Sequence, residues 1–281
     1  MKKRFVPAAL LLAGWLLMLV ASVTCSAEAV PAPQGVPKYQ KPSVPKFIDS
    51  ESDGAKITKL KIAVCEYRPT DGSDLRVKLL GVVHIGDAEG YQFLSKQFDS
   101  CDVVLYELVA PKGTKPDKSK PSPLAKALGY GNIAKQLGLA SQMDHVDYNR
   151  GNFVHADMDF SDLVARGRDQ GEDEFTLGLR TAADVLQLMN KMEKEGGGPN
   201  DPLQLLGGNI GQDPNQLRQL AAKQLSSGTD ALEGISVLKK YLIEERNSAV
   251  CKELDNQIAL GKTKIGIFYG AGHNKDFHRR L

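Results

Sequence analysis

Two histidines stand in the same short pattern near opposite ends of the sequence. Gly81 precedes His84 by three positions at the end of an apolar run, and Gly270 precedes His273 in the same way. Imidazole is the usual general base, and a common metal ligand, near neutral pH. Glycine lets the backbone turn sharply and approach a ligand closely. Because ligands of open α/β sheets bind at the carboxyl ends of the strands, we predict that both histidines belong to one functional site.

A carboxylate and a guanidinium are candidates to join these histidines. Glu107 lies late in the apolar run 103–108, where burial is costly unless a metal, an arginine or a catalytic role compensates. The alternative is a strand that ends one residue earlier and leaves Glu107 solvated. Arg246 lies in a predicted helix at 235–260, close to its apolar stripe. An inward Arg246 would pair with a carboxylate or hold a substrate carboxylate or phosphate, and the alternative is a solvated helix face.

A third candidate group is His155 and Asp157. On an extended segment the two side chains would point the same way, so they would ligate a metal or orient its ligands. The alternative is structural, because Asp159 or Ser161 would cap a helix that starts near Asp162.

The elements that position these residues alternate between strand and helix patterns. Alternating apolar residues predict a strand at 60–64, which pairs as a hairpin with a second strand at 77–83. Apolar residues at helical spacing follow, and the continuous apolar run 103–108 predicts a strand buried on both faces. This order of strand, helix and strand indicates a parallel crossover. A buried strand at 264–269 leads to the second histidine.

The middle of the chain has a different character. We predict a helical insert or cap over 111–234, with helices at 124–139, 160–168, 175–195 and 215–225. The predicted fold class is therefore α/β, with a mixed central sheet, flanking helices, a helical insertion and two halves that each end a strand in Gly-x-x-His.

The first residues indicate export. Lys2, Lys3 and Arg4 precede an apolar run at 5–23 and small residues suited to cleavage, so we predict a signal peptide at 1–27. The protein would then be periplasmic or extracellular. The alternative is a retained anchor, because the run 5–23 is long enough to tether the protein in a membrane. Residues 28–54 are rich in proline and predict a disordered linker before a domain at 55–281.

Composition excludes other classes of protein. The 281 residues carry a net charge of +2 without a basic block, which argues against nucleic acid as a partner. Cleavage would leave Cys65, Cys101 and Cys251, which are too few for a disulfide framework, although one bridge is compatible with export.

Together these residues resemble the TraB/TIKI family, also called TraB/PrgY/GumN. The resemblance covers roughly residues 59–277 and rests on both Gly-x-x-His motifs, on Glu107 and on Arg246. It implies an α/β domain with a helical insert. TIKI members are metal-dependent proteases that use manganese or cobalt. Asn247 stands where the family often has aspartate, which removes one carboxylate that could bind a metal.

The predicted function is that of a metal-dependent hydrolase, and a peptidase is one form of it. Water bound to a manganese, cobalt or zinc ion would attack the carbonyl of a peptide or small-molecule substrate. The predicted ligands are His84, Glu107, His273, His155 and Asp157. Glu107 would be a ligand or the general base, and Arg246 would steady the oxyanion or hold Glu107 in place. The alternative is a non-catalytic protein that binds haem or a peptide, with Tyr106, Tyr269 or the histidines as haem ligands.

Overall fold

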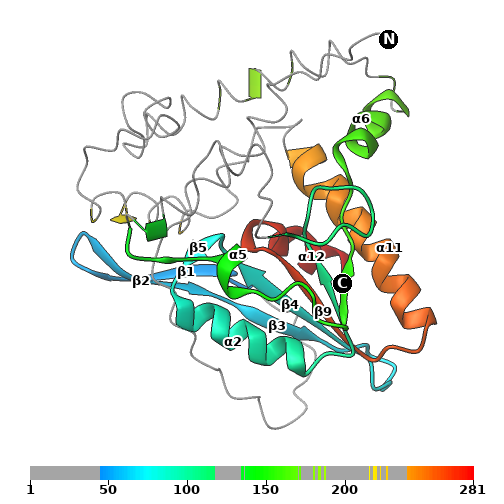
Figure 1. The fold of residues 1–281 in the computed structure, drawn as a ribbon, viewed down its shortest axis with the longest axis horizontal. Coiled ribbons are helices and arrows are strands. Elements are labelled where there is room, and N and C mark those ends of the chain that lie inside the picture. The colour runs from blue at the N-terminus through cyan, green and yellow to red at the C-terminus, as the bar shows by residue number, and fades with distance from the viewer. Residues whose placement is uncertain are drawn as a thin grey trace.

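The computed structural model describes residues 45–117, 137–169 and 239–281, together with residues 134, 135 and 171 and isolated positions between 180 and 226. Figure 1 shows one twisted central sheet with helices packed against it. The predicted signal peptide and most of the predicted linker lie outside the described residues. Within the part of the chain that is described, no helix is long and apolar enough to cross a membrane.

The central sheet has five strands in the order β3-β4-β9-β6-β8. Their bounds are Val64–Tyr67, Arg76–Val82, Lys264–Gly270, Val103–Tyr106 and Phe153–His155. β3 pairs antiparallel with β4, and all the other pairs are parallel. The predicted hairpin is therefore correct for the strand at 77–83 but only in part for its partner, because residues 60–62 of the predicted strand at 60–64 belong to a different strand, which does not pair with β4. The carboxyl ends of β4, β9, β6 and β8 therefore meet at one edge, which brings both histidine motifs to the same side of the sheet.

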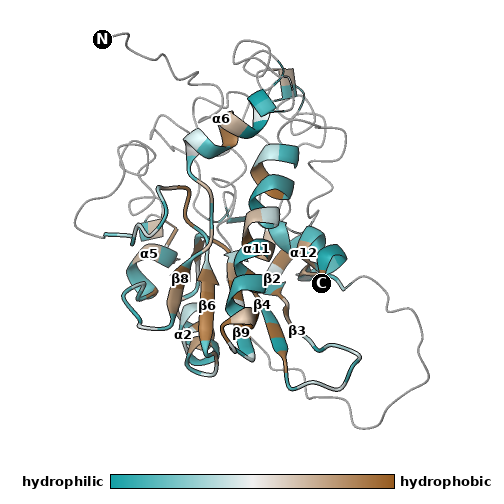
Figure 2. Cartoon of the chain, turned by 90° about the vertical axis from the view of Figure 1, so that its right-hand side faces the viewer, coloured by the Kyte–Doolittle hydropathy of each residue, from teal (hydrophilic) through white to brown (hydrophobic). Residues whose placement is uncertain are grey.

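Alternate residues of the parallel strands form two separate cores. Ile265 and Ile267 of β9 face one core, which includes Val250 of helix α11 (Glu245–Ala259), whereas Phe268 faces the other core. Helix α2 (Ala88–Asp99) covers that second face through Tyr91, Leu94 and Phe98. Figure 2 shows the central strands as largely hydrophobic between the covering helices. Burial on both faces explains why their sequences read as continuous apolar runs.

The ordered domain begins earlier than predicted. β1 (Ile48–Asp53) pairs antiparallel with β2 (Lys56–Ile62), so the linker prediction is wrong for residues 48–53. β1 was missed because it is charged and largely exposed, so no alternation of apolar residues marks it. Phe47, just before it, is buried in the core that contains β9.

The predicted helical insert contains part of the sheet. β8 extends the sheet beyond β6, and β7 (Ala140–Ser141) pairs with β5 (Ile85–Gly86), so the predicted helical insert also contributes two short strands that were not predicted. Strands of two or three residues are too short to show a period in the sequence. Helix α5 (Gln142–His145) is also short, whereas helix α6 (Phe160–Asp169) agrees with the predicted helix at 160–168. The predicted helices at 175–195 and 215–225 lie outside the described ranges apart from isolated positions, and so does most of the one at 124–139, whose last three residues are described and are not helical.

The last part of the chain carries the second motif. A π-helical turn, η2 (Lys240–Glu244), leads into helix α11 (Glu245–Ala259), which packs on the sheet. β9 then ends in a 3-10 turn, η3 (Ala271–His273), followed by helix α12 (Asn274–Arg280). π-Helical turns are often found at functional sites, and this one lies directly before Arg246.

Candidate functional site

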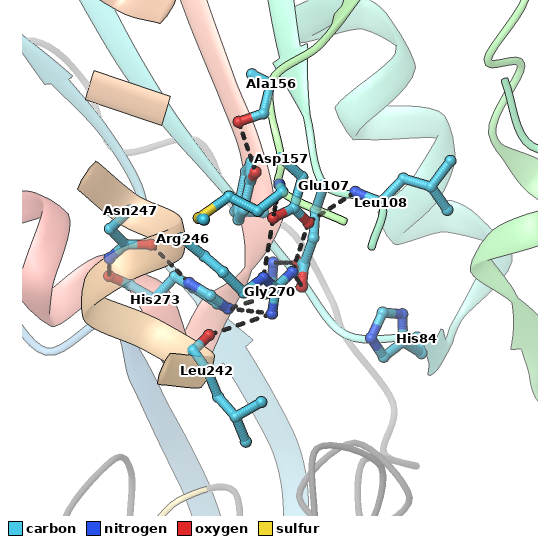
Figure 3. Close-up of polar contacts among 12 residues, drawn as sticks. His84, Glu107, Leu108, Ala156, Asp157, Leu242, Arg246, Asn247, Gly270 and His273 are labelled. Atoms are coloured by element: carbon cyan, nitrogen blue, oxygen red, sulfur yellow. Dashed lines mark hydrogen bonds and ion pairs between the residues drawn. The ribbon is translucent and has the colours of Figure 1, made fainter. Parts of the chain in front are cut away.

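A buried ion-pair cluster lies at the carboxyl edge of the sheet (Figure 3). It consists of Glu107 after β6, Asp157 after β8, Arg246 of α11 and His273 after β9. We call these four residues the edge cluster. Arg246 is 1% exposed and lies 2.6 Å from the Glu107 carboxylate and 2.7 Å from that of Asp157. Four elements distant in sequence thus converge on one guanidinium.

Arg246 uses all of its donors within the protein. Nε and Nη2 donate to the two oxygens of Asp157, and Nη2 also donates to Glu107. Nη1 donates to the carbonyl of Leu242 in the π-helical turn and approaches His273 Nε2 at 3.5 Å. No N–H remains for a substrate oxyanion unless one of these bonds breaks. Of the two roles predicted for Arg246, this geometry suits the one that holds Glu107 in place.

Glu107 is held as a carboxylate although it is buried. Burial by itself raises the pKa of this group, but the charge of Arg246 is the largest opposing effect, and the pKa is lowered to about 2. His273 and His84 would add to this lowering only when they are protonated. Oε2 also accepts a hydrogen bond from the backbone N–H of Gly270, at 2.7 Å. The alternative of a solvated Glu107 is therefore wrong, because its side chain is only 8% exposed.

His273 is fixed in one neutral form. Asn247 Nδ2 donates to the carboxylate of Asp276 and to the carbonyl of His273, so Asn247 Oδ1 must face the ring. His273 Nδ1 lies 2.6 Å from this oxygen and therefore carries the proton, which leaves the lone pair on Nε2. Burial lowers the pKa of His273 to about 4 despite the nearby Glu107. Asn247 is thus a positioning residue, which its place in the sequence did not reveal.

His84 is held in the same way on the other side of Glu107. Its Nδ1 lies 2.7 Å from Gln142 Oε1, and Gln142 Nε2 donates to the hydroxyl of Tyr148. In this orientation of the amide, His84 carries its proton on Nδ1 and its lone pair on Nε2. Gln142 is buried at the start of α5 and was not predicted as a site residue. Both motif histidines are therefore oriented by an amide oxygen.

The motif glycines make room for polar side chains. A Cβ at Gly81 would lie 2.6 Å from Nδ2 of Asn274, and one at Gly270 would lie 3.2 Å from Oε2 of Glu107. Neither glycine has a positive φ, so space rather than backbone conformation explains them. In each Gly-x-x-His motif, the glycine therefore lets a side chain from another segment lie close to the backbone three residues before the histidine.

His155 does not face the edge cluster. Its Nδ1 accepts the backbone N–H of Gly113, and its Nε2 lies 2.6 Å from the carbonyl of Leu108. Both ring nitrogens are thus engaged by the loop after β6, which does not fit the prediction that His155 is a metal ligand. Asp159 accepts the N–H of Asp162 at 2.7 Å, which confirms the predicted cap of α6.

The remaining donors do not form a complete metal site. Among the described residues, no group of three or more acidic, histidine or cysteine side chains could hold a metal. His273 Nε2 and Glu107 Oε1 converge at 3.6 Å, but Arg246 contacts both of them. Asp157 is engaged by Arg246 and by the N–H groups of Leu108 and Met158. A catalytic zinc ion usually has three protein ligands, so the residues present do not by themselves fit one.

The neutral state of His273 predicts a pH dependence of stability. Its folded pKa of about 4 lies below its ordinary value of 6.5, so the unfolded chain binds the proton more readily. The contribution of His273 to the free energy of unfolding is therefore fully present above about pH 6.5 and is lost as the pH falls from 6.5 to about 4. We expect wild type to lose about 2 kcal/mol more than His273→Gln between pH 7 and 4.5. Urea unfolding at both pH values measures this, and equal losses in the two proteins would contradict a buried neutral His273.

Comparison with known proteins identifies no similar protein. No protein-family model matches the chain, and neither a curated protein nor a solved structure matches it. The resemblance to the TraB/TIKI family therefore stays a prediction that rests on the motif residues.

Proposed function

We propose that the domain is a hydrolase whose reaction takes place at the carboxyl edge of the sheet, between His84 and the edge cluster. The observation that supports this is the common orientation of the two motif histidines. Each has its Nδ1 on an amide oxygen, from Gln142 or Asn247, and so keeps an Nε2 lone pair. A histidine fixed in one tautomer, with a carboxylate in the same site, is the arrangement that general-base chemistry uses.

His84 is the base in this proposal because it is only partly buried, whereas His273 is 4% exposed and its pKa is lowered to about 4. His84 Nε2 takes the proton of an attacking water, which then adds to a peptide or ester carbonyl. The ionised Glu107 stabilises the imidazolium that forms, and His84 returns the proton to the leaving group. Arg246 keeps Glu107 in place and does not contact the substrate.

The predicted manganese, cobalt or zinc ion stays a prediction. Arg246 contacts both His273 Nε2 and Glu107 Oε1, so these two atoms do not make a complete metal site, and no step of the proposed reaction uses a metal. Haem binding has less support, because the hydroxyls of Tyr106 and Tyr269 each bond a backbone carbonyl and both rings are buried.

A hydrolysis screen tests the proposal. The purified protein is incubated with a defined peptide mixture and with a series of small esters, with each divalent metal and with a chelator. We expect turnover of at least one substrate class, reduced roughly 10-fold to 100-fold in Glu107→Gln because the imidazolium loses its counter-charge. Far-UV circular dichroism controls for folding. Turnover that is unchanged in a folded Glu107→Gln protein would rule out this role of the carboxylate.

A further inference from the structure

A second group of charged side chains lies at the opposite, amino-terminal edge of the sheet. It lines a pocket of about 210 Å³ between the first residues of β4 and β9 and the end of α2. The polar side chains in its wall are Glu66, Arg76, Lys78, Ser100 and Lys264. We call this the amino-edge pocket. It shares no residue with the edge cluster, so it needs an explanation of its own.

Two cations face each other across adjacent strands in this pocket. Arg76 and Lys264 are register partners in the parallel pair of β4 and β9, and both side chains line the pocket. Neither side chain makes a hydrogen bond or ion pair within the described part of the chain. Like charges on neighbouring strands repel each other, so this pairing costs stability unless an anion lies between them.

A third cation is fixed in the wall. Lys78 lies two residues after Arg76 and therefore on the same face of β4. Its Nζ donates to Gln97 Oε1 at 3.2 Å and to Ser100 Oγ at 3.0 Å. Both acceptors are neutral, so the positive charge of Lys78 stays uncompensated by them.

Each acidic group around the pocket already has a partner. Glu66, the acidic residue of the wall, lies opposite Lys78 in the pair of β3 and β4, and its carboxylate pairs with Arg68 at 2.8 Å. Asp102, which follows the wall, attracts Lys264 electrostatically but directs its carboxylate to the backbone N–H groups of Thr263 and Lys264. Three cations therefore face the space with one paired carboxylate against them, which leaves the pocket positive.

We propose that the amino-edge pocket binds a phosphoryl anion. A guanidinium and two ammonium groups around a small space suit a tetrahedral dianion, because charge-assisted hydrogen bonds to phosphate are strong. A water molecule occupies about 30 Å³ of liquid, so the pocket has room for a phosphate group. The inference does not depend on the proposed hydrolase activity, although β4 and β9 carry the two motif histidines at their other ends.

Calorimetric titration with inorganic phosphate at low ionic strength tests this inference. We expect one saturable site in the purified protein, weakened at least 10-fold in Arg76→Gln and in Lys264→Gln. Lys262→Gln is the matched control, because it removes the same charge two residues away and outside the pocket. We expect its affinity to stay within about twofold of wild type. Phosphate should also raise the melting temperature of wild type and not that of the Arg76→Gln/Lys264→Gln double variant.

Sedimentation with phosphatidic acid vesicles separates two sources of the phosphoryl group. Vesicle binding lost in the same two variants would assign the group to a lipid headgroup. Vesicle binding that ignores these variants, together with phosphate binding that depends on them, would assign it to a soluble anion. The inference is overturned if neither probe binds in a way that depends on Arg76 and Lys264, or if Lys262→Gln weakens binding equally.

Discussion

Arg246→Met should destabilise the protein by about 3–5 kcal/mol, because it leaves two buried carboxylates without a counter-charge. The side chains of Glu107 and Asp157 are 8% and 0% exposed, and both lie within hydrogen-bonding distance of Arg246. Methionine fills much of the same volume, so the loss reports the charge rather than a cavity. Urea unfolding at pH 7 measures the free energy of unfolding of both proteins.

Lowering the pH should reduce the difference in the free energy of unfolding between Arg246→Met and wild type. Without the guanidinium, burial raises the pKa of Glu107 in the folded variant, so this carboxylate is protonated more readily. The variant therefore recovers stability relative to wild type as the pH falls from 7 to 5. Arg279→Met is the control, because its Asp276 partner is shared with a second arginine and Arg279 itself is 55% exposed. We expect it to cost less than 1 kcal/mol. Equal effects of the two variants would contradict a structural role for the edge cluster.

His84→Ala should lower kcat by roughly 10²-fold to 10⁴-fold on any substrate found in the screen, because it removes the general base. His84 is partly exposed, so the variant should keep the fold. Added imidazole should restore part of the activity, since a free base can enter the space that the side chain leaves.

His145→Ala is the matched control for this loss. His145 lies on α5, the helix that also carries Gln142, and its ring stacks on Tyr91 at 5.8 Å. Its Nδ1 lies 3.1 Å from the carbonyl oxygen of Ser141, so this ring nitrogen is not directed at the edge cluster. We expect its kcat to stay within about threefold of wild type. Full activity in a folded His84→Ala protein would exclude His84 as the base.

The sequence predicted the strands that carry the motifs because their apolar runs are strong signals. The strands at 77–83, 103–108 and 264–269 agree with β4, β6 and β9 to within one or two residues. Since parallel strands share a carboxyl edge, the strand pattern by itself predicts that their polar ends lie together. β8 was missed because its three residues were too few to show periodicity.

The pairing inside the site could be predicted only in part. Glu107 and Arg246 were candidates because each charge interrupts an apolar pattern. Arg246 pairs with Asp157 as well as with Glu107. Asp157 lies 89 residues before Arg246, and no spacing in the sequence links these two residues. The amides of Gln142 and Asn247 were not recognised either, because an amide on a short helix has no distinctive pattern. Their role depends on the amide oxygen facing a histidine Nδ1, and this orientation is a property of the folded structure that the sequence does not encode in any local pattern.

The central claim is that both motif histidines are Nδ1–H tautomers, and that Nε2 of His84 takes the proton of the attacking water. Two-dimensional ¹⁵N–¹H NMR of the histidine rings tests the tautomers without a substrate, with His84→Ala and His273→Gln used for assignment. At pH 8 we predict pyrrole-type shifts for Nδ1 and pyridine-type shifts for Nε2 in both rings. For His273 this state should persist to about pH 5, because its pKa is about 4. A pyridine-type Nδ1 in either ring, or a protonated His273 at pH 7, would contradict the account.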